Sequence, residues 1–389
     1  MKTVPEKGDP AAGPESEQIG RRSAFRRLAG SVLVSNLIVH RPAFADEHPG
    51  PAVEADPAAQ IEQSPRETGM GLVIYDYNIL RRQLKQKHQS FDLFEPLTFL
   101  RHCHRVGAGG MQASLGVLQS KQIQQLRQFA DEHDLFIDAI IRPPKDDSDL
   151  DRFTAEIKTA RDVGVQAART TIIPGRRYER FQTLEEFKLF ERRGREMLER
   201  AAPVVEKHRV RFAVENHKDQ RLDERIALFK HLDSEFIGAC VDTGNSFALL
   251  DGAYEPIEAL APYAFTVHLK DQALQPYDDG FLLGDCSLGD GSFDLKRMVR
   301  IIRDAKPDIH FALELITRDP LKVPCLKNSF YSTMPNLPAT DLARTLRFVD
   351  EHQTTEQRYP SKLNKGEQAM LEHANVMRSL KYTGTELKL

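Results

Sequence analysis

Phe-Ala-Val-Glu at 212–215, Ala-Cys-Val-Asp at 239–242, Phe-Thr-Val-His at 265–268 and Phe-Ala-Leu-Glu at 311–314 follow one pattern. Each is a short, β-rich apolar run that ends in an acid or a histidine and precedes polar or turn residues. In a parallel barrel the carboxyl ends of successive strands converge on one mouth. The pattern therefore predicts a barrel with a divalent-cation site made by the residues that end these runs, Glu215, Asp242, His268 and Glu314.

From residue 69 onward, apolar runs of strand length alternate with segments of helical spacing. The expected strands are 71–75, 110–115, 136–141, 167–173, 211–215, 237–242, 264–268 and 310–315. The clearest helical segments are 94–106, 121–133, 150–163, 184–208, 222–232, 256–260 and 293–305. Strands that alternate with helices pair in parallel through right-handed crossovers. Eight such units over roughly 280 residues predict an α/β fold, a parallel eight-stranded TIM (β/α)8 barrel.

The main alternative to a closed barrel is an open, doubly wound sheet. No G-x-G-x-x-G follows the first expected strand and no phosphate loop is present, which favours the barrel. We assign the barrel to residues 69–352, with a final helix at 336–352. Residues 353–389 are polar, and we expect a C-terminal tail there with one helix near 366–380.

The first 45 residues resemble a twin-arginine export signal. Two arginine pairs, Arg21-Arg22 and Arg26-Arg27, precede a mildly apolar stretch and then the small-residue site Ala43-Phe44-Ala45. The spacing from Arg22 to Phe25 is one residue longer than usual, and a short basic amphipathic helix is the alternative. The pattern predicts a periplasmic or otherwise exported protein. Residues 46–68, rich in Pro, Ala and Glu, predict a flexible leader.

Bulk properties narrow the range of partners. The chain has 389 residues and a formal net charge of −3, which gives no reason to expect nucleic acid or an anionic membrane surface. No apolar run reaches the roughly 18 residues that span a bilayer, so we expect no stable membrane anchor. The four cysteines match no zinc-finger or redox spacing and are expected to be unpaired, although a Cys286–Cys325 disulfide stays open. The sequence also leaves homo-oligomerisation open.

Three carboxylates and one imidazole form an oxygen-rich ligand set. Such a set suits one divalent ion, and manganese, magnesium, cobalt and zinc all remain candidates. The absence of a cysteine ligand argues against a structural zinc site. Any one of these residues could be a surface ion pair or a hydrogen-bonded core histidine. Their occurrence at the same position of four successive strands favours the metal site.

These segments resemble the xylose-isomerase-like TIM-barrel superfamily, the sugar phosphate isomerases and epimerases related to AP endonuclease. The matching segments are Glu215-Asn216-His217, Asp242-Thr243-Gly244-Asn245, His268-Leu269-Lys270-Asp271, Glu314 and the loop Gly289-Asp290-Gly291 before Phe293. The resemblance covers about residues 70–350. It implies a small carbohydrate substrate and one divalent metal ion. It also implies that two glutamates, here Glu215 and Glu314, hold the metal and face opposite sides of the substrate.

A chemical mechanism follows from this arrangement. A metal on a carbonyl and its neighbouring hydroxyl acidifies the adjacent C–H by stabilising an enediolate. One glutamate then removes the proton and the other returns it, which gives an isomerase or epimerase of a sugar or keto-sugar. With the same base, a metal-dependent lyase or dehydratase could act on keto-sugars or 3-keto-glycosides by β-elimination. A non-catalytic sugar-binding barrel is the third alternative.

The three-metal AP-endonuclease branch is disfavoured, because the ends of strands two and three offer Gln112, Ser114, Arg142 and Pro143 but no histidine. The candidate substrate-binding residues are His217, Asn245, Lys270 and Arg142. A buried structural role competes for His217, and a surface ion pair with Asp271 competes for Lys270. Asn245 falls where many epimerases of the superfamily place a substrate-contacting histidine. Arg176-Arg177 either bind an anionic group or form a solvated loop, and Asp285 and Asp290 are expected in turns.

Overall fold

The computed structural model describes residues 65–389 except 174 and 356. The expected export signal at 1–45 and the leader up to residue 64 lie outside the described residues. The last leader residues are described, and they contact the barrel. Thr68 is buried and its hydroxyl donates to the carbonyl of Leu389 at 2.7 Å, while the amide of Glu67 donates to the carbonyl of Gly107 at 2.9 Å.

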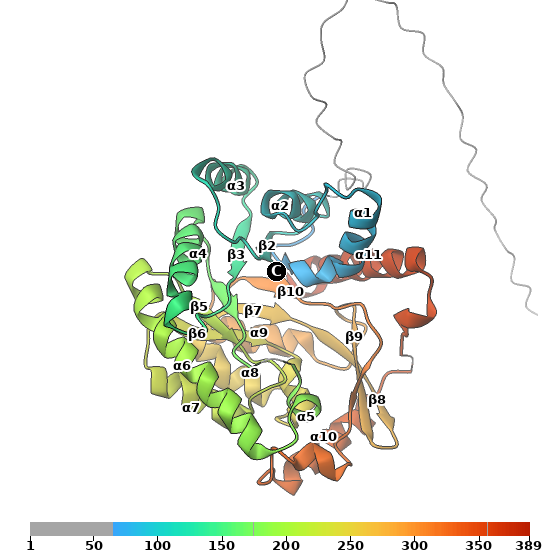
Figure 1. Ribbon diagram of the computed structural model, residues 1–389. Helices are drawn as coiled ribbons and strands as arrows, with labels where there is room; N and C mark the ends of the chain where they lie inside the picture. Colours follow the sequence, from blue (N-terminus) through green and yellow to red (C-terminus); the bar gives the residue numbers. More distant parts are fainter. Residues whose placement is uncertain (1–64, 174, 356) are drawn as a thin grey trace, which may run out of the picture. The chain divides into compact units, whose positions relative to one another are not determined.

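Eight parallel strands close into the expected barrel (Figure 1). They are β1 (Gly71–Val73), β2 (Gly110–Ala113), β3 (Phe136–Ile140), β4 (Ala168–Thr170), β5 (Phe212–Glu215), β6 (Ile237–Asp242), β7 (Ala264–Leu269) and β10 (Phe311–Leu313). Each strand pairs with its neighbours in chain order, and β10 pairs with β1 to close the ring. Every expected strand is thus confirmed, and all eight are short and almost fully buried.

Helices connect the strands, as the periodicity predicts. The connecting helices are α2 (Pro96–Arg105), α3 (Ser120–Glu132), α4 (Leu150–Val163), α6 (Leu184–His208), α7 (Leu222–Leu232), α8 (Glu255–Leu260) and α9 (Leu295–Ala305). Two helices were not expected, α1 (Asn78–Lys87) after the first strand and the short α5 (Arg177–Arg180) after β4. Within the described part of the chain, no helix is long and apolar enough to cross a bilayer.

A second, three-stranded antiparallel sheet branches from the barrel after β7 (Figure 1). It contains β8 (Asp271–Tyr277), β9 (Gly280–Cys286) and β11 (Leu321–Val323), in the order β11-β9-β8. This sheet was not expected from the sequence. Its hairpin turns at Asp278-Asp279, because Tyr277 pairs with Gly280, and the mostly polar run 271–277 does not read as a strand. Asp285, expected in a turn, lies in β9 and is buried. The hairpin begins three residues after His268 and therefore borders the mouth of the barrel.

The final helices differ from the expected arrangement. Helix α10 (Ala339–Glu351) packs against β8 and β9, whereas α11 (Lys365–Tyr382) packs beside α1 and next to the first strand (Figure 1). The carboxylate of Glu372 on α11 accepts hydrogen bonds from the amides of Ile79 and Leu80, both at 2.8 Å, at the start of α1. The segment expected as a peripheral tail therefore covers the first barrel unit. The four cysteines are all free thiols.

Candidate metal centre

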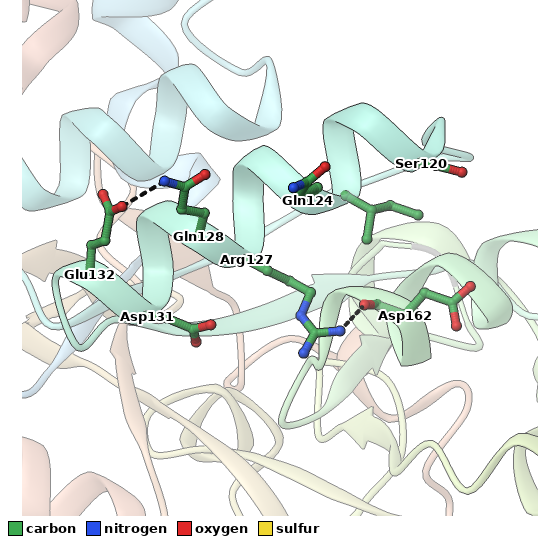
Figure 2. Close-up of a pocket in the computed structure, with 8 residues that line it drawn as sticks. Ser120, Gln124, Arg127, Gln128, Asp131, Glu132 and Asp162 are labelled. Carbon is green, nitrogen blue, oxygen red and sulfur yellow. Dashed lines mark hydrogen bonds between the residues drawn. The ribbon is translucent and has the colours of Figure 1, made fainter.

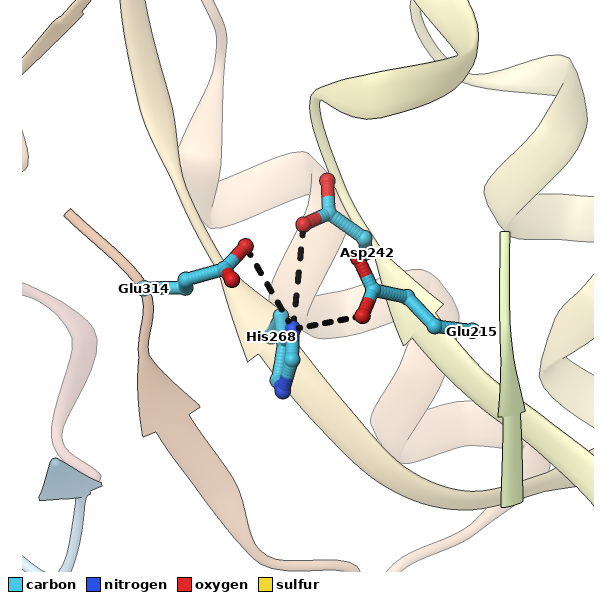
Figure 3. A group of neighbouring side chains, drawn as sticks. All are labelled: Glu215, Asp242, His268 and Glu314. Atoms are coloured by element: carbon cyan, nitrogen blue, oxygen red, sulfur yellow. Dashed lines mark ion pairs between the residues drawn. The ribbon is translucent and has the colours of Figure 1, made fainter. Parts of the chain in front are cut away.

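The four expected ligand residues meet at the mouth of the barrel (Figure 3). Glu215 and Asp242 are the last residues of β5 and β6, His268 lies one residue before the end of β7, and Glu314 follows β10. One potential ligand atom from each lies within 4.8 Å of the others. All four residues are at most 4% exposed. Parallel register accounts for this convergence, because Asp242 pairs with His268, which in turn pairs with Ala312 on β10.

The imidazole of His268 stands at the centre of the group. Its Nδ1 lies 3.5 Å from Glu314 Oε2, 3.7 Å from Glu215 Oε2 and 3.8 Å from Asp242 Oδ2 (Figure 3). Its other nitrogen, Nε2, is 2.7 Å from Gln112 Oε1. Because an amide oxygen only accepts hydrogen bonds, Nε2 carries the proton in the neutral ring. The lone pair of Nδ1 therefore faces the three carboxylates.

The donor set fits a divalent cation. Among the described residues, His268 Nδ1 and Asp242 Oδ2 are buried and take part in no hydrogen bond. Asp242 Oδ2 does lie 3.0 Å from Lys270 Nζ, but outside hydrogen-bonding geometry. Buried polar atoms without partners are rare in native proteins and call for an explanation. A lone pair and three carboxylates aimed at one point are what a divalent ion coordinated by nitrogen and oxygen requires.

Asp242 is oriented by its surroundings. Its Oδ1 accepts hydrogen bonds from the amides of Gly244 and Asn245, at 2.9 and 2.7 Å, so Oδ2 is the atom left for a ligand. The side chain of Asn216 exchanges two hydrogen bonds with the backbone of Asp242, at 2.8 and 2.7 Å. Burial raises the pKa of Asp242 to about 6, against the charge of Lys270.

Both oxygens of Glu215 are held by protein donors. Oε2 accepts from the guanidinium of Arg169 on β4, with Nε at 2.6 Å, and Oε1 accepts from Asn245 Nδ2 at 2.9 Å. Burial acts to raise the pKa of Glu215, but the charge of Arg169 outweighs it and the pKa is lowered. Arg169 was not singled out from the sequence. Its position inside the fourth strand, where a buried charge needs a partner, was the available signal.

Glu314 has one free oxygen. Its Oε2 accepts from Lys270 Nζ at 2.7 Å, while no donor among the described residues forms a hydrogen bond with Oε1. Burial acts to raise the pKa of Glu314, but the charge of Lys270 outweighs it, and the pKa is lowered well below its ordinary value. The two glutamates therefore differ, since Glu215 is fully engaged and Glu314 keeps one oxygen available for a substrate.

A second layer of polar groups supports His268. Gln112 at the end of β2 binds its Nε2, and Asp138 of β3 lies beside Gln112. Asp138 accepts from Thr266 Oγ1 at 2.6 Å and from the amide of Ala167 at 3.0 Å. In the sequence, Gln112 served only to show that the second strand ends without a histidine ligand. Its role depends on a contact between residues 156 positions apart, which no local pattern reveals.

The structure places three of the four expected substrate-binding residues near the centre. Asn245 and Lys270 are buried and contact Glu215 and Glu314 directly. His217 lies beside Glu215 and has a buried Nδ1 without a hydrogen-bond partner among the described residues. Arg142 is exposed and lines a separate pocket with Ile172 and Ile173.

Two alternatives from the sequence are wrong. Lys270 does not form a surface pair with Asp271, because it is buried and its ammonium lies 3.0 Å from Asp242 and 2.7 Å from Glu314. Arg177 does not lie in a solvated loop, because it is 1% exposed and donates to the carbonyl of Thr333 at 2.6 Å. Its guanidinium also pairs with Glu224 at 2.5 Å, so Arg177 ties helix α5 to helix α7 and to the segment that follows β11.

A surface hollow on the outer face of α3 is separate from this centre (Figure 2). It has a volume of about 690 Å³. Arg127 bridges to the carbonyl of Asp162 on α4 at 3.2 Å, and Gln128 donates to Glu132 at 2.7 Å. These side chains bond to one another at the surface, and none of the proposed metal ligands lines the hollow.

Comparisons with known proteins agree with this fold. A curated relative, 3-oxo-isoapionate decarboxylase of Pectobacterium atrosepticum, is 28% identical over 114 residues, which cover 29% of this chain and 42% of the relative. The chain thus matches less than half the length of that protein.

Two solved structures show weak likeness. The 3-keto-D-glucoside 4-epimerase of E. coli matches with a TM-score of 0.47 and 13% identity, over 73% of this chain and 99% of its own. A xylose isomerase-like TIM barrel protein of Mycobacterium smegmatis, in complex with magnesium, matches with a TM-score of 0.43 and 16% identity, over 64% and 88%. Neither likeness assigns an activity. The model of the family "Xylose isomerase-like TIM barrel" matches residues 100–348, well over half of the chain, and the chain therefore belongs to that family.

Proposed function

We propose that this chain is a divalent-metal-dependent enzyme that moves a proton at the carbon next to a carbonyl group of a small keto-sugar, as an isomerase or epimerase. The observation that carries the proposal is the lone pair of His268 Nδ1, which faces three buried carboxylates while Gln112 holds the opposite nitrogen. Membership of a family that resembles sugar isomerases and epimerases supports a carbohydrate as the substrate.

Glu215, Asp242, His268 and Glu314 would hold the ion, which when bound would polarise a carbonyl and a neighbouring hydroxyl of the substrate. Manganese, magnesium, cobalt and zinc all suit these ligands. The burial of the four residues excludes bulk water, which strengthens electrostatic interactions and protects a reactive enediolate from side reactions.

The proton is handled by the two glutamates. Glu314 Oε1 is free of protein donors, so we assign to it the removal of the proton from the substrate. Glu215 is oriented by Arg169 and Asn245 and is assigned the return of a proton. The ammonium of Lys270, beside Glu314 and Asp242, is placed to stabilise negative charge that develops on a substrate oxygen.

A second candidate function uses the same metal centre but breaks a C–C bond of the substrate instead of a C–H bond. The similarity to a protein named a decarboxylase favours it, because loss of CO2 from a β-keto acid leaves the same kind of enediolate as loss of a proton. Expulsion of a group from the β carbon is a further outcome, which would make the protein a lyase.

Metal analysis and solvent exchange test the proposal. Purified protein should contain about one divalent ion for each chain, and a panel of ketoses incubated with it in D2O should gain deuterium next to the carbonyl. Glu314→Gln should lower that exchange by 10²-fold or more, the usual contribution of a general base. Glu258→Gln, an exposed surface glutamate paired with Arg297, is the matched control and should change nothing.

Absence of both metal and exchange would contradict the proposal. If a β-keto sugar acid incubated with the protein releases CO2, or a 3-keto-glycoside gives an enone, in place of a labelled isomer, the decarboxylase or lyase alternative replaces the isomerase.

We also propose that the chain is exported. The order of arginine pairs, apolar stretch and Ala43-Phe44-Ala45 supports cleavage after Ala45. N-terminal sequencing of the protein recovered from its host should begin at Asp46, and a mature protein that begins before Gly20 would reject export by this signal.

A further inference from the structure

Lys218 is a buried cation without a carboxylate partner. It follows Glu215 by three residues, is 3% exposed, and donates from Nζ to the side-chain oxygen of Asn245. No carboxylate of the described residues forms an ion pair with it within 4.0 Å. Buried lysines are normally paired, because an isolated charge in a protein interior is costly.

The charged groups nearest Lys218 do not supply the missing ion-pair partner. Lys270 and Arg318 repel it, while Asp285 and Asp242 attract it from beyond ion-pair distance. The carboxylate of Asp285 is already shared, since it pairs with Arg318 at 3.0 Å and accepts from Gln272 at 3.0 Å. Three cations, Lys218, Lys270 and Arg318, thus surround one carboxylate beyond the metal ligands.

The position of Lys218 indicates where a compensating anion would sit. Asn245 connects it to the metal centre, since its oxygen accepts from Lys218 while its nitrogen donates to Glu215 at 2.9 Å. Lys218 is therefore separated from a proposed metal ligand by a single amide side chain. If the reacting carbon of a substrate lies at the proposed metal, a substrate group that contacts Lys218 is only a few bonds away from that carbon. A carboxylate on a short sugar chain meets this condition.

We propose that Lys218 binds a carboxylate of the substrate, and that the substrates are keto-sugar acids rather than neutral ketoses. This inference rests on the proposed metal-dependent function of the same site. A carboxylate on Lys218 forms a charge-assisted hydrogen bond and supplies the anionic partner that this buried ammonium lacks. The neighbouring Nδ1 of His217, buried without a hydrogen-bond partner, lies on the same loop.

Matched probes test this without any substitution. D-Fructose, D-fructuronate and 2-keto-D-gluconate differ only in whether a terminal carbon is a hydroxymethyl or a carboxylate. Calorimetric titration of the manganese-loaded full chain should show at least one keto acid binding about tenfold or more tighter than fructose. Fructose 6-phosphate is a further probe, because a phosphate shares the anionic charge but is larger and carries up to two negative charges.

Three variants locate the effect at Lys218. Lys218→Met should remove the preference for the acid with less than threefold change for fructose, and Lys218→Arg should retain most of it. Lys230→Met makes the same change at an exposed lysine of α7 and should leave all affinities unaltered. Metal content should stay the same in each variant, which separates loss of the anion site from loss of the metal centre.

The proposal is overturned if fructose binds as tightly as both acids, if Lys218→Met weakens fructose and acids equally, or if fructose 6-phosphate is preferred over both acids. Deuterium exchange on fructose without any preference for acids would reject this inference and leave the proposed function standing. Lys218-dependent binding of an acid without exchange, decarboxylation or elimination would reject the proposed function and leave the anion site standing.

Discussion

At the scale of single residues, the metal centre depends on how each ligand atom is oriented. Asp242 and Glu215 are each held by backbone or side-chain donors, and His268 is held by Gln112. Partners of this kind set the tautomer of a histidine and the direction of its lone pair. Gln112 is therefore part of the centre although it is not one of the proposed ligands.

Replacing Gln112 should weaken metal binding. We expect Gln112→Leu to raise the dissociation constant for manganese by about 10- to 100-fold, because the ring loses the acceptor that keeps the proton on Nε2. Competition with a chromophoric chelator measures this constant. Gln128→Leu, at an exposed position of α3, is the control. An unchanged dissociation constant in Gln112→Leu would show that Gln112 does not orient the ligand.

Metal binding should also depend on pH through Asp242. Burial raises its pKa from 3.8 to about 6, so a proton must leave the carboxyl before a metal can bind below that pH. The dissociation constant should rise as pH falls through about 6, which titrations at pH 5, 6, 7 and 8 would measure. A constant that is flat over this range would contradict the role of Asp242 as a ligand.

The same shift affects the stability of the metal-free protein. Because the pKa in the folded state lies above the ordinary value, the folded state binds the proton more tightly than the unfolded chain. This contribution to the free energy of unfolding is fully present below about pH 3.8 and is lost as pH rises through about 6. Bound metal should reverse that trend, so the increase in melting temperature on adding manganese should grow from pH 5 to pH 7.

At the scale of elements, the loop after β9 is organised by Asp271 at the start of β8. Its carboxylate accepts hydrogen bonds from the amides of Gly289 and Gly291, both at 3.0 Å, and of Gln272 at 2.9 Å. The glycine at 291 is required by close approach, since a Cβ there would collide with the carboxylate of Asp271. The backbone amides of the Gly289-Asp290-Gly291 motif thus bind the carboxylate of Asp271, which gives the motif a structural role.

Substituting Asp271 should loosen this loop. An amide in Asp271→Asn has only one acceptor oxygen, so at least one buried N–H loses its partner at a cost of about 1–3 kcal/mol. Hydrogen exchange of the amides at 289–293 should accelerate, and urea unfolding should report the loss of stability. Asp290→Asn, on the same loop but with an exposed side chain, should leave exchange unchanged. Equal protection in the two variants would disprove the role of Asp271.

At the scale of the whole molecule, the C-terminal segment completes the barrel. Helix α11 packs beside α1, and the last carbonyl of the chain, at Leu389, accepts hydrogen bonds from Thr68 and Gly69 just before β1. The ends of the described segment therefore meet at the first strand. Chain order alone places the helix expected at 336–352 as the last of the barrel, followed by a tail.

Two substitutions in α11 test this arrangement. Leu380→Ala removes a fully buried side chain and should lower the free energy of unfolding by about 2–5 kcal/mol. Met370→Ala, at a residue that is 73% exposed on the same helix, should change it by less than about 0.5 kcal/mol. Denaturant titration compares the two. Similar small effects would mean that α11 is a peripheral tail, as the sequence suggested.

The eight strands, their order and the convergence of Glu215, Asp242, His268 and Glu314 were all predictable from the sequence. Apolar runs of strand length, separated by segments with helical periodicity, can be recognised from the local sequence. A parallel barrel then brings the carboxyl ends of all its strands to one mouth. Local patterns therefore determined the fold and the composition of the candidate site.

Only the tertiary structure decided which atoms in that site are engaged and which are free. Arg169 with Glu215, Gln112 with His268, and Lys218 beside Asn245 are contacts between separate strands and loops. The energy of a buried charge depends on what surrounds it in three dimensions, and no spacing along the chain encodes that. For the same reason the antiparallel sheet at the mouth and the closing position of α11 emerged only once the chain was folded.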